Sequence, residues 1–451
     1  MKLETSADPA GLWRRLGRWR IPVVGAGALL MLASGGLLLT PAPGQPARLT
    51  PAAVTADPVA RARERLTRLP GDWRTWAQLG MAYLEQGRSS GDPARYAEAE
   101  QALRQSLTVH PDGNADALAG LGALAAARHE FAEALRLGRQ AVAVDAYHAA
   151  GYGVTADALI ELGRYDQAWA AVQSMVDLRP DTGSYARASY TWQLRGNHTE
   201  AVDLMTRALH AAPDATQAAF TLEHLTGLAF SRGDLDTAAA HVADGLRRVP
   251  GHPPLLAMRA RIAAARTGPD GDLSAARADW TQVLDRLPLP GYAAEYGDLL
   301  DAAGDTEGAR QQYDLARAAF GLQAAQGVDV GIEQAAFDTE HGDAATALAE
   351  AEAAYSRRPS IAGADTLAWA LHTRGRDTEA LDYADRALRL GTDDALMLYH
   401  RGMISAGLAD DPDRARAARE DLAKALELNP YFSVRHARDA RVRLTALGGH
   451  P

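Results

Sequence analysis

The sequence predicts an all-α protein, a solenoid of about ten similar helix pairs preceded by one transmembrane helix. Two observations support the solenoid. A unit of about 35 residues recurs between residues 73 and 430, and a fixed period of this length is typical of solenoids. Only 6% of the residues are aromatic, and the alanine-rich composition favours short, closely packed helices over a sheet.

The segment 149–180 is the clearest copy of the unit. Its first half carries apolar and small residues at helical spacing, and Gly163 interrupts the pattern. A second apolar series includes Ala168 and ends before Pro180. The unit therefore reads as a helix, a tight turn and a second antiparallel helix.

Small residues recur at two places in the copies. One lets the second helix pack closely against the first, and the other is a glycine where a left-handed turn residue is needed. The packing alanines are spaced 33 to 38 residues apart: Ala99, Ala134, Ala168, Ala201, Ala238, Ala276, Ala309, Ala347, Ala380 and Ala418. The turn glycines are Gly163, Gly196, Gly233, Gly304, Gly342 and Gly375.

The first copy carries a recognisable signature. Trp76, Leu79, Gly80 and Tyr83 match the pattern W-x2-L-G-x2-Y, and Ala99 matches its second half. The chain therefore resembles the tetratricopeptide repeat (TPR) family. The resemblance implies a right-handed α-solenoid of about ten TPR helix pairs, in which the first helices line a concave surface that binds extended peptides or partner segments.

The N-terminal region predicts a membrane anchor. Residues 1–20 end in a basic cluster, and residues 21–39 carry no charge. Nineteen helical residues span about 28 Å, close to the ~30 Å hydrocarbon core. Because the basic residues precede this stretch, we expect a cytoplasmic N-terminus, a signal-anchor helix at 21–40 and a single-pass cell-membrane protein with an extracytoplasmic array.

A cleaved secretory signal is the alternative. Such signals have apolar regions of roughly 7 to 15 residues followed by a small-residue cleavage site. The nearest candidate, Thr40-Pro41-Ala42, is followed at once by Pro43, which is a poor context for cleavage. An intact segment 21–39 in the mature protein would exclude this alternative.

The rest of the chain divides into three parts. Residues 41–56 are proline-rich and predict an extended linker. Residues 57–430 predict the TPR array, which a lone amphipathic helix opens. Residues 431–451 predict a C-terminal capping helix with a polar outer face, which a solenoid needs to stay soluble.

Composition and motifs argue against several functions. The net charge is -10, and residues 41–451 carry -13, so the array would repel nucleic acid. The chain contains no cysteine, and its histidines are scattered singly, so we expect neither a metal nor a cofactor. Residues 402–407 resemble a nucleophile elbow, but their spacing is wrong and they lie in a predicted helix. We expect no enzymatic activity and no catalytic residue.

Helical phase predicts an acidic concave surface with aromatic anchors, opposed only by Arg261. The expected partner is therefore a protein or peptide segment rich in arginine or lysine, bound with salt-sensitive affinity. The alternative is that a chain this acidic carries carboxylates everywhere, and that some of the aromatic residues belong to the core. The predicted partner-binding residues are Glu85, Asp157, Glu161, Tyr190, Glu223, Phe230, Asp298, Asp301, Glu340, Asp365, Trp369, His372 and Tyr399.

These inferences lead to one main functional hypothesis. The chain is expected to be a membrane-anchored TPR scaffold that assembles or tethers an envelope or secretion complex. Two alternatives stay open: an accessory subunit that presents substrate to a separate envelope enzyme or transporter, and a cleaved, secreted binding protein.

Overall fold

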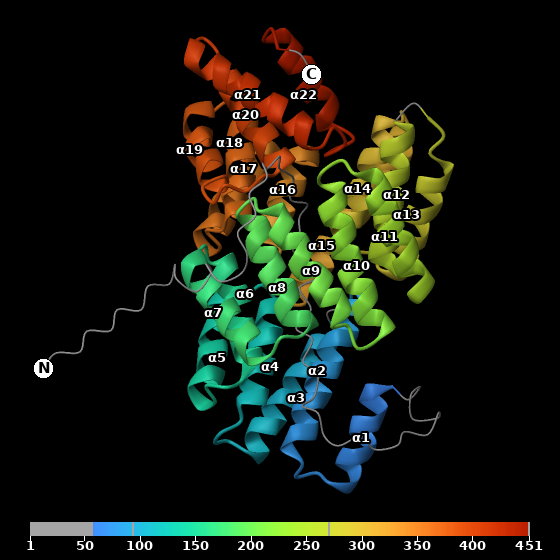
Figure 1. The fold of residues 1–451 in the computed structure, drawn as a ribbon, viewed down its shortest axis with the longest axis vertical. Helices are drawn as coiled ribbons and strands as arrows, with labels where there is room; N and C mark the ends of the chain where they lie inside the picture. Colours follow the sequence, from blue (N-terminus) through green and yellow to red (C-terminus); the bar gives the residue numbers. More distant parts are fainter. Residues whose placement is uncertain (1–56, 93, 269–270, 450–451) are drawn as a thin grey trace, which may run out of the picture.

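The computed structural model describes residues 57–92, 94–268 and 271–449 (Figure 1). The predicted cytoplasmic segment, transmembrane helix and linker, residues 1–56, lie outside the described residues. Within the described ranges, no helix combines the length and the apolar character that crossing a bilayer requires.

The described chain is all-α, as predicted, and its twenty-two helices include ten consecutive pairs. Helix α1 (Pro58–Arg68) precedes the pairs and α22 (His436–Ala446) follows them. The first helices of the pairs are α2 (Trp73–Ser90), α4 (Ala115–Ala127), α6 (Ala149–Glu161), α8 (Thr182–Leu194), α10 (Ala215–Phe230), α12 (Pro253–Thr267), α14 (Pro290–Ala302), α16 (Gly331–His341), α18 (Ile361–Thr373) and α20 (Ala395–Gly407). The second helices are α3 (Arg95–Val109), α5 (Phe131–Val144), α7 (Tyr165–Leu178), α9 (His198–His210), α11 (Leu235–Arg248), α13 (Ser274–Arg286), α15 (Thr306–Ala325), α17 (Ala344–Arg357), α19 (Asp377–Ala387) and α21 (Pro412–Leu428).

Small side chains set the spacing within each pair. All ten predicted packing alanines are buried, with at most 1% of their surface exposed. On the opposing helix of the first pair, a Cβ at Gly80 would lie 2.5 Å from Cγ of Leu103. Close approach of the two helices therefore depends on the small residues, because larger side chains would force them apart.

The turns within the pairs mostly follow the prediction. Gly163, Gly196, Gly233, Gly304 and Gly375 adopt positive φ angles of 67 to 80°. The prediction is wrong for Gly342, whose φ is -121°, because α16 ends in an extended residue. The turn of the second pair instead uses a left-handed histidine, His129, with a φ of 60°.

The first helices lie on the inside of the curved array. Among the described helices, the first helices of neighbouring pairs contact one another at most junctions, for example α4 with α6 and α16 with α18. Second helices make no comparable contacts with one another. This asymmetry bends the array towards the first helices, and we call the side that they line the inner surface.

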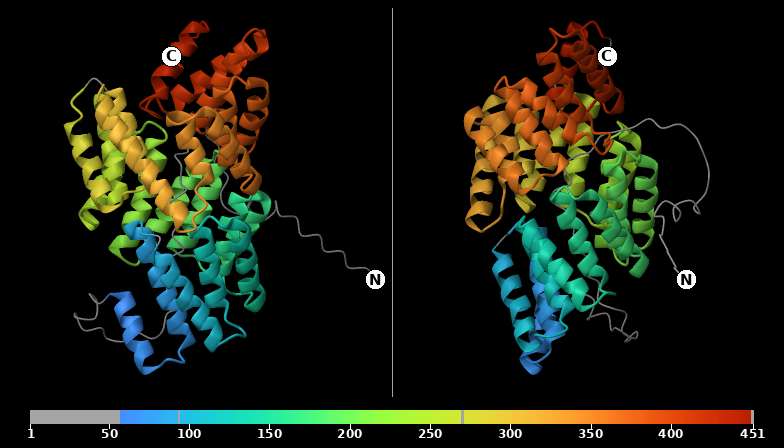
Figure 2. Two further views of the ribbon diagram at one scale, coloured as in Figure 1. Left: turned by 180° about the vertical axis from the view of Figure 1, so that it is seen from behind. Right: turned by 90° about the vertical axis from the view of Figure 1, so that its left-hand side faces the viewer.

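The array winds far enough for its second half to rest on its first half (Figures 1 and 2). In each of pairs one to five, the turn between the two helices contacts a loop of the second half of the array. That loop follows the second helix of the pair that comes five pairs later in the chain. Most of the hydrogen bonds at these contacts join residues 196 to 201 positions apart. One superhelical turn therefore takes between five and six pairs, and we call these meetings the inter-turn contacts.

Backbone groups form much of the inter-turn contacts. The Asp329 amide donates to the carbonyl of Arg128 at 2.9 Å. The Ile361 amide donates to the hydroxyl of Tyr165 at 2.8 Å. The Thr392 hydroxyl donates to the Leu194 carbonyl at 2.5 Å. Without these bonds, polar backbone groups would be unpaired at the partly buried inter-turn contacts. The bonds therefore fix the register of one superhelical turn on the next.

The junction between the seventh and eighth pairs is built differently from the others. Helix α15 is 20 residues long, and neither it nor α14 packs backbone-close against α16. Ring contacts bridge the gap instead: Tyr313 stacks on His341 with centroids 4.0 Å apart, and Phe320 lies 5.8 Å from Phe337. Side chains rather than close helix packing therefore hold this junction.

The inter-turn contacts can be tested with two glycines of matched conformation. Gly163 and Gly375 both have left-handed φ angles, 67° and 69°, so an alanine is strained by a similar amount, about 1 kcal/mol, at either. Only at position 163 would the new Cβ meet the other superhelical turn, 2.3 Å from the Pro359 carbonyl oxygen. Gly163→Ala should therefore cost about 1–3 kcal/mol more than Gly375→Ala, measured by thermal unfolding. Equal losses would contradict the contact.

Candidate functional site: the inner surface

The structure places all thirteen predicted partner-binding residues on first helices, and therefore on the helices that line the inner surface. It does not bring them together into one patch, because they are distributed from α2 to α20. They lie on α2 (Glu85), α6 (Asp157, Glu161), α8 (Tyr190), α10 (Glu223, Phe230), α14 (Asp298, Asp301), α16 (Glu340), α18 (Asp365, Trp369, His372) and α20 (Tyr399).

Most of the acidic residues among them already have cationic partners in the same chain. Arg187 of α8 binds Asp157 of α6 through two hydrogen bonds of 2.9 and 2.8 Å. Arg261 binds a residue that was not predicted, Glu295, through two bonds of 2.7 Å. The expectation that Arg261 alone opposes the acidic groups is therefore wrong. Such two-point arginine pairs have fixed geometry, so they stiffen the wall between neighbouring pairs.

Glu161 belongs to the inter-turn contacts rather than to a free surface. Its carboxylate accepts a 2.9 Å hydrogen bond from Arg358, which lies 197 residues later. Arg358 also pairs with Glu333 at 3.2 Å, and its guanidinium lies 4.8 Å from the ring centroid of Phe131. Burial raises the pKa of Glu161, although the charge of Arg358 acts to lower it. A buried charge of this kind is tolerated only while its partner is present.

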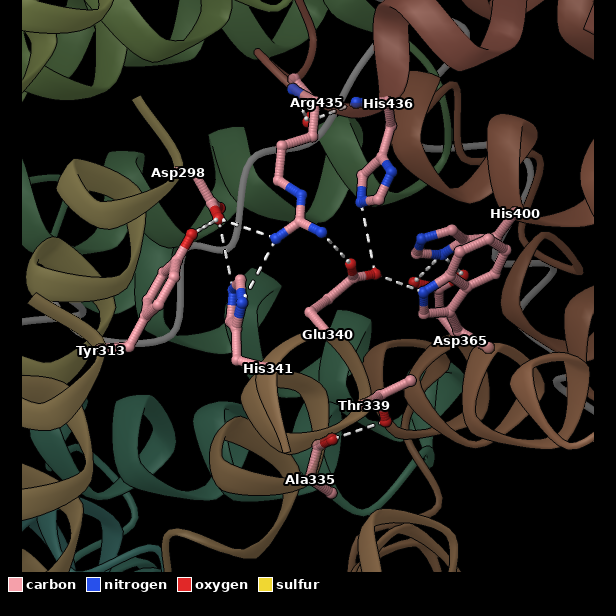
Figure 3. A network of polar contacts seen from close by, with 12 residues as sticks. Asp298, Tyr313, Ala335, Thr339, Glu340, His341, Asp365, His400, Arg435 and His436 are labelled. Carbon is pink, nitrogen blue, oxygen red and sulfur yellow. Dashed lines mark hydrogen bonds and ion pairs between the residues drawn. The ribbon is translucent and has the colours of Figure 1, made fainter. Parts of the chain in front are cut away.

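Polar residues from three parts of the fold meet near the C-terminus (Figure 3). We call this group the C-terminal network, and it consists of Asp298, Tyr313, Glu340, His341, Arg435 and His436. Arg435 precedes α22, yet it lies 3.2 Å from Asp298 on α14 and 3.7 Å from Glu340 on α16. The network thus spans the junction between the seventh and eighth pairs.

Histidine and tyrosine complete the network around Asp298. The Tyr313 hydroxyl donates to Asp298 at 3.0 Å. Nη1 of Arg435 lies 3.2 Å from Nδ1 of His341, and Nε2 of His341 lies 3.2 Å from Asp298. Because a guanidinium only donates, Nδ1 must accept and Nε2–H donates to the carboxylate.

Glu340 is held in its ionised form by its neighbours. Trp369 donates to it through Nε1 at 2.5 Å, and Nε2 of His436 lies 3.3 Å away. Burial acts to raise the pKa of Glu340, but the bonds from His436 and Trp369 and the charge of Arg435 outweigh it and hold the pKa at about 2.

The predicted residues of α18 are also engaged within the chain. Both oxygens of Asp365 lie 3.0 Å from Nδ1 of His400. Nδ1 of His372 lies 2.5 Å from Asp377. The Trp369 ring stacks on His400 and His372, with centroids 4.3 and 4.8 Å away. These side chains form a packed polar layer that links α18 to α20 and α22.

Two of the predicted aromatic anchors are core residues. Phe230 is 4% exposed and Tyr399 is 2% exposed, so neither offers a free ring to a partner. Helical phase placed them correctly on first helices, but the neighbouring pairs cover their rings. Tyr190 is half-buried, and burial raises its pKa.

Three predicted carboxylates form no hydrogen bond or ion pair with any residue that the structure describes. Glu85 and Asp301 are exposed, whereas Glu223 is half-buried. Burial raises the pKa of Glu223 to about 7, and the charge of Arg261 only partly offsets this effect. Arg261 is already bound to Glu295. Glu223 therefore lies half-buried, without a bonded cation among the residues that the structure describes.

Some of the pairs that were missed carried a signal in the sequence. Arg261 and Glu295 are 34 residues apart, and Asp365 and His400 are 35 apart. One repeat length places such residues at equivalent positions on neighbouring helices, where opposite charges pair. No comparable signal pointed to Arg435, which reaches across several pairs.

No protein-family model and no curated protein matches the chain. Among solved structures, TTC0263, a thermophilic TPR protein of Thermus thermophilus, is 22% identical and covers 43% of this chain and 98% of its own, with a TM-score of 0.36. A tetratricopeptide repeat protein of Parabacteroides merdae is 17% identical and covers 55% and 98%, with a TM-score of 0.39.

Human IFIT1, solved as a dimer with m7Gppp-AAAA, is 16% identical to the chain. It covers 74% of this chain and 77% of its own, with a TM-score of 0.47.

The position of Glu223 predicts a specific pH dependence of stability. Because its pKa is about 7 in the folded chain instead of its ordinary value of 4.5, the folded chain loses stability as pH rises between these values. Glu223→Gln removes the loss and should stabilise the protein at pH 8 by up to about 3 kcal/mol, with no gain near pH 4. Thermal unfolding at both pH values measures this.

The control is Glu427→Gln, which removes the same charge from an exposed position on α21. It should shift the melting temperature little at either pH. A gain at pH 8 that is equal for both variants, or a gain for Glu223→Gln that persists at pH 4, would contradict the assignment.

Proposed function

We propose that this chain is a scaffold of TPR type, with a right-handed array, that binds an extended basic segment of a protein partner along its inner surface. One observation carries the proposal. Glu223 lies half-buried on the inner surface with a raised pKa, and no cationic side chain in the described part of the chain is bonded to it. An arginine or lysine of a partner would relieve the cost of ionising this carboxylate.

The architecture supports binding along a surface rather than at one point. Ten stacked pairs present their first helices to the same side, and the inter-turn contacts hold these helices in place. Asp301 and Glu85 add exposed carboxylates on α14 and α2. A segment that follows the inner surface would pass several acidic groups in turn, which suits an extended basic chain.

The remaining features favour a protein partner and a binding role. A net charge of -13 over residues 41–451 disfavours nucleic acid. The helix pairs fill the described chain from α2 to α21, which leaves little room for a separate catalytic domain. We propose that the chain acts by binding, without catalysis and without a cofactor.

We also propose that residues 21–40 anchor the chain in the cell membrane with the array on the extracytoplasmic side. The uncharged stretch after a basic cluster supports this orientation. In that position, the scaffold would assemble or tether an envelope or secretion complex. N-terminal sequencing of the mature protein tests whether the anchor is retained.

A basic peptide tests the binding proposal directly. Fluorescence anisotropy measures the affinity of the full chain for a fluorescein-labelled peptide of six arginines, with a peptide of six glutamates as the control ligand. We expect binding of the arginine peptide alone, weakening as salt rises because the ion pairs are screened. Glu223→Gln should weaken it about tenfold at pH 8.

Glu427→Gln serves again as the matched control, because it removes one negative charge from the outer helix α21. Its affinity should stay within about twofold of the unaltered chain. Equal weakening by the two variants would show that only net charge matters, and preference for the glutamate peptide would contradict the proposal outright.

A further inference from the structure

We propose that Arg435 and His436 form an internal competitor for the inner surface. They occupy the carboxylates of Asp298 and Glu340, which would otherwise be offered to the basic residues of the partner. This inference rests on the proposed function. It adds a regulatory contact to it: the chain's own C-terminal segment must leave these carboxylates before a partner can use all of the inner surface.

Arg435 directly precedes α22, and His436 is the first residue of that helix. Arg435 lies outside the helix, between α21 and α22. The Ser433 hydroxyl accepts from the amides of Arg435 at 3.3 Å and His436 at 3.1 Å, which fixes the backbone at both residues. From there Arg435 reaches Asp298, which lies 137 residues earlier (Figure 3).

The acceptors around Arg435 fit a basic side chain. Asp298 and Glu340 supply two carboxylates, and Nδ1 of His341 supplies an acceptor 3.2 Å from the guanidinium. Trp369 and Tyr313 donate to the carboxylates from the far side and so hold their oxygens in place. A guanidinium, with five donors in a plane, can contact all three acceptors. A partner's arginine would make the same contacts as Arg435.

Solvent access separates this contact from the structural ion pairs. The side chains of Arg435, Asp298 and Glu340 are 29%, 26% and 22% exposed. Arg358, in the inter-turn contacts, is only 3% exposed. Water and a competing cation can therefore reach the Arg435 contact, and exchange there avoids the large penalty of uncovering a fully buried charge.

Arg435 and the first turn of α22 can leave the carboxylates while the rest of α22 stays in place. Ala440 and Leu444 of α22 are 0% and 1% exposed and pack on the last pair. The Arg419 side chain also donates to the Leu447 carbonyl at 3.2 Å. These contacts anchor the helix independently of Arg435. Release would instead loosen the junction between the seventh and eighth pairs, which Arg435 bridges by contacting both α14 and α16.

The test uses the full chain and the labelled peptide of six arginines. Arg435→Ala should bind the peptide about tenfold more tightly than the unaltered chain, because Asp298 and Glu340 lose the guanidinium that lies between them. The gain should disappear when Asp298→Asn and Glu340→Gln are added. Arg438→Ala is the matched control: Arg438 is exposed on α22 and forms no ion pair with any described residue, so its loss should change affinity less than twofold.

Hydrogen exchange of the unaltered chain gives a second measurement that needs no variant. Adding the arginine peptide should speed amide exchange in residues 429–436 and 326–341, because the competitor leaves and the junction loosens. Unchanged exchange in both segments while peptide is bound would overturn the inference, as would equal affinities of Arg435→Ala and Arg438→Ala.

The failure of this inference can be told apart from the failure of the proposed function. If the unaltered chain binds the peptide and Glu223→Gln weakens binding, but Arg435→Ala has no effect, only the competitor is excluded. If neither the unaltered chain nor Arg435→Ala binds at low salt, the basic-partner function is excluded together with it.

Discussion

The contact between successive superhelical turns constrains the rest of this structure. Close packing at buried alanines gives every pair a similar geometry. Repetition of that geometry brings the helix-to-helix turn of each of the first five pairs into contact with the loop that ends the pair five places later. In a solenoid that contacts only its neighbours, stability is a sum over adjacent repeats. Here, additional contacts join residues about 200 positions apart, so they fix the curvature of the inner surface.

That curvature explains why most of the carboxylates on the first helices are paired with cations of the same chain. First helices that converge on the inside bring carboxylates close together, where a lowered dielectric increases their repulsion. Arginines offset this repulsion. Arg187 comes from a neighbouring pair and binds Asp157, Arg358 comes from the next superhelical turn and binds Glu161, and a third arginine comes from the C-terminal segment. Glu223 has no bonded cation among the described residues, and burial raises its pKa to about 7.

The sequence predicted the helix pairs well because their determinants are local. An alanine at each crossing and a glycine at most turns are needed wherever two helices meet closely. The sequence also assigned the acidic residues to first helices, because a few residues are enough to define the phase of a helix. Their partners were not: Arg358 and Arg435 lie many pairs away from the groups they bind. Their positions depend on the superhelical pitch. The pitch is the sum of small rotations at every junction between pairs. The rings of Phe230 and Tyr399 were misjudged for a related reason, because neighbouring pairs cover them.

The distance between the two superhelical turns tests this account most directly. The chain has no cysteine, so spin labels can be attached to cysteines introduced at exposed Asp166 and Arg386. These lie close to Tyr165 and Arg389, where the guanidinium carbon is 5.3 Å from the ring centroid. Double electron–electron resonance on the full chain should give one short, narrow distance that lengthens when the protein is unfolded in urea. A long, broad distribution in the folded protein would show that the turns do not touch, and would contradict the account.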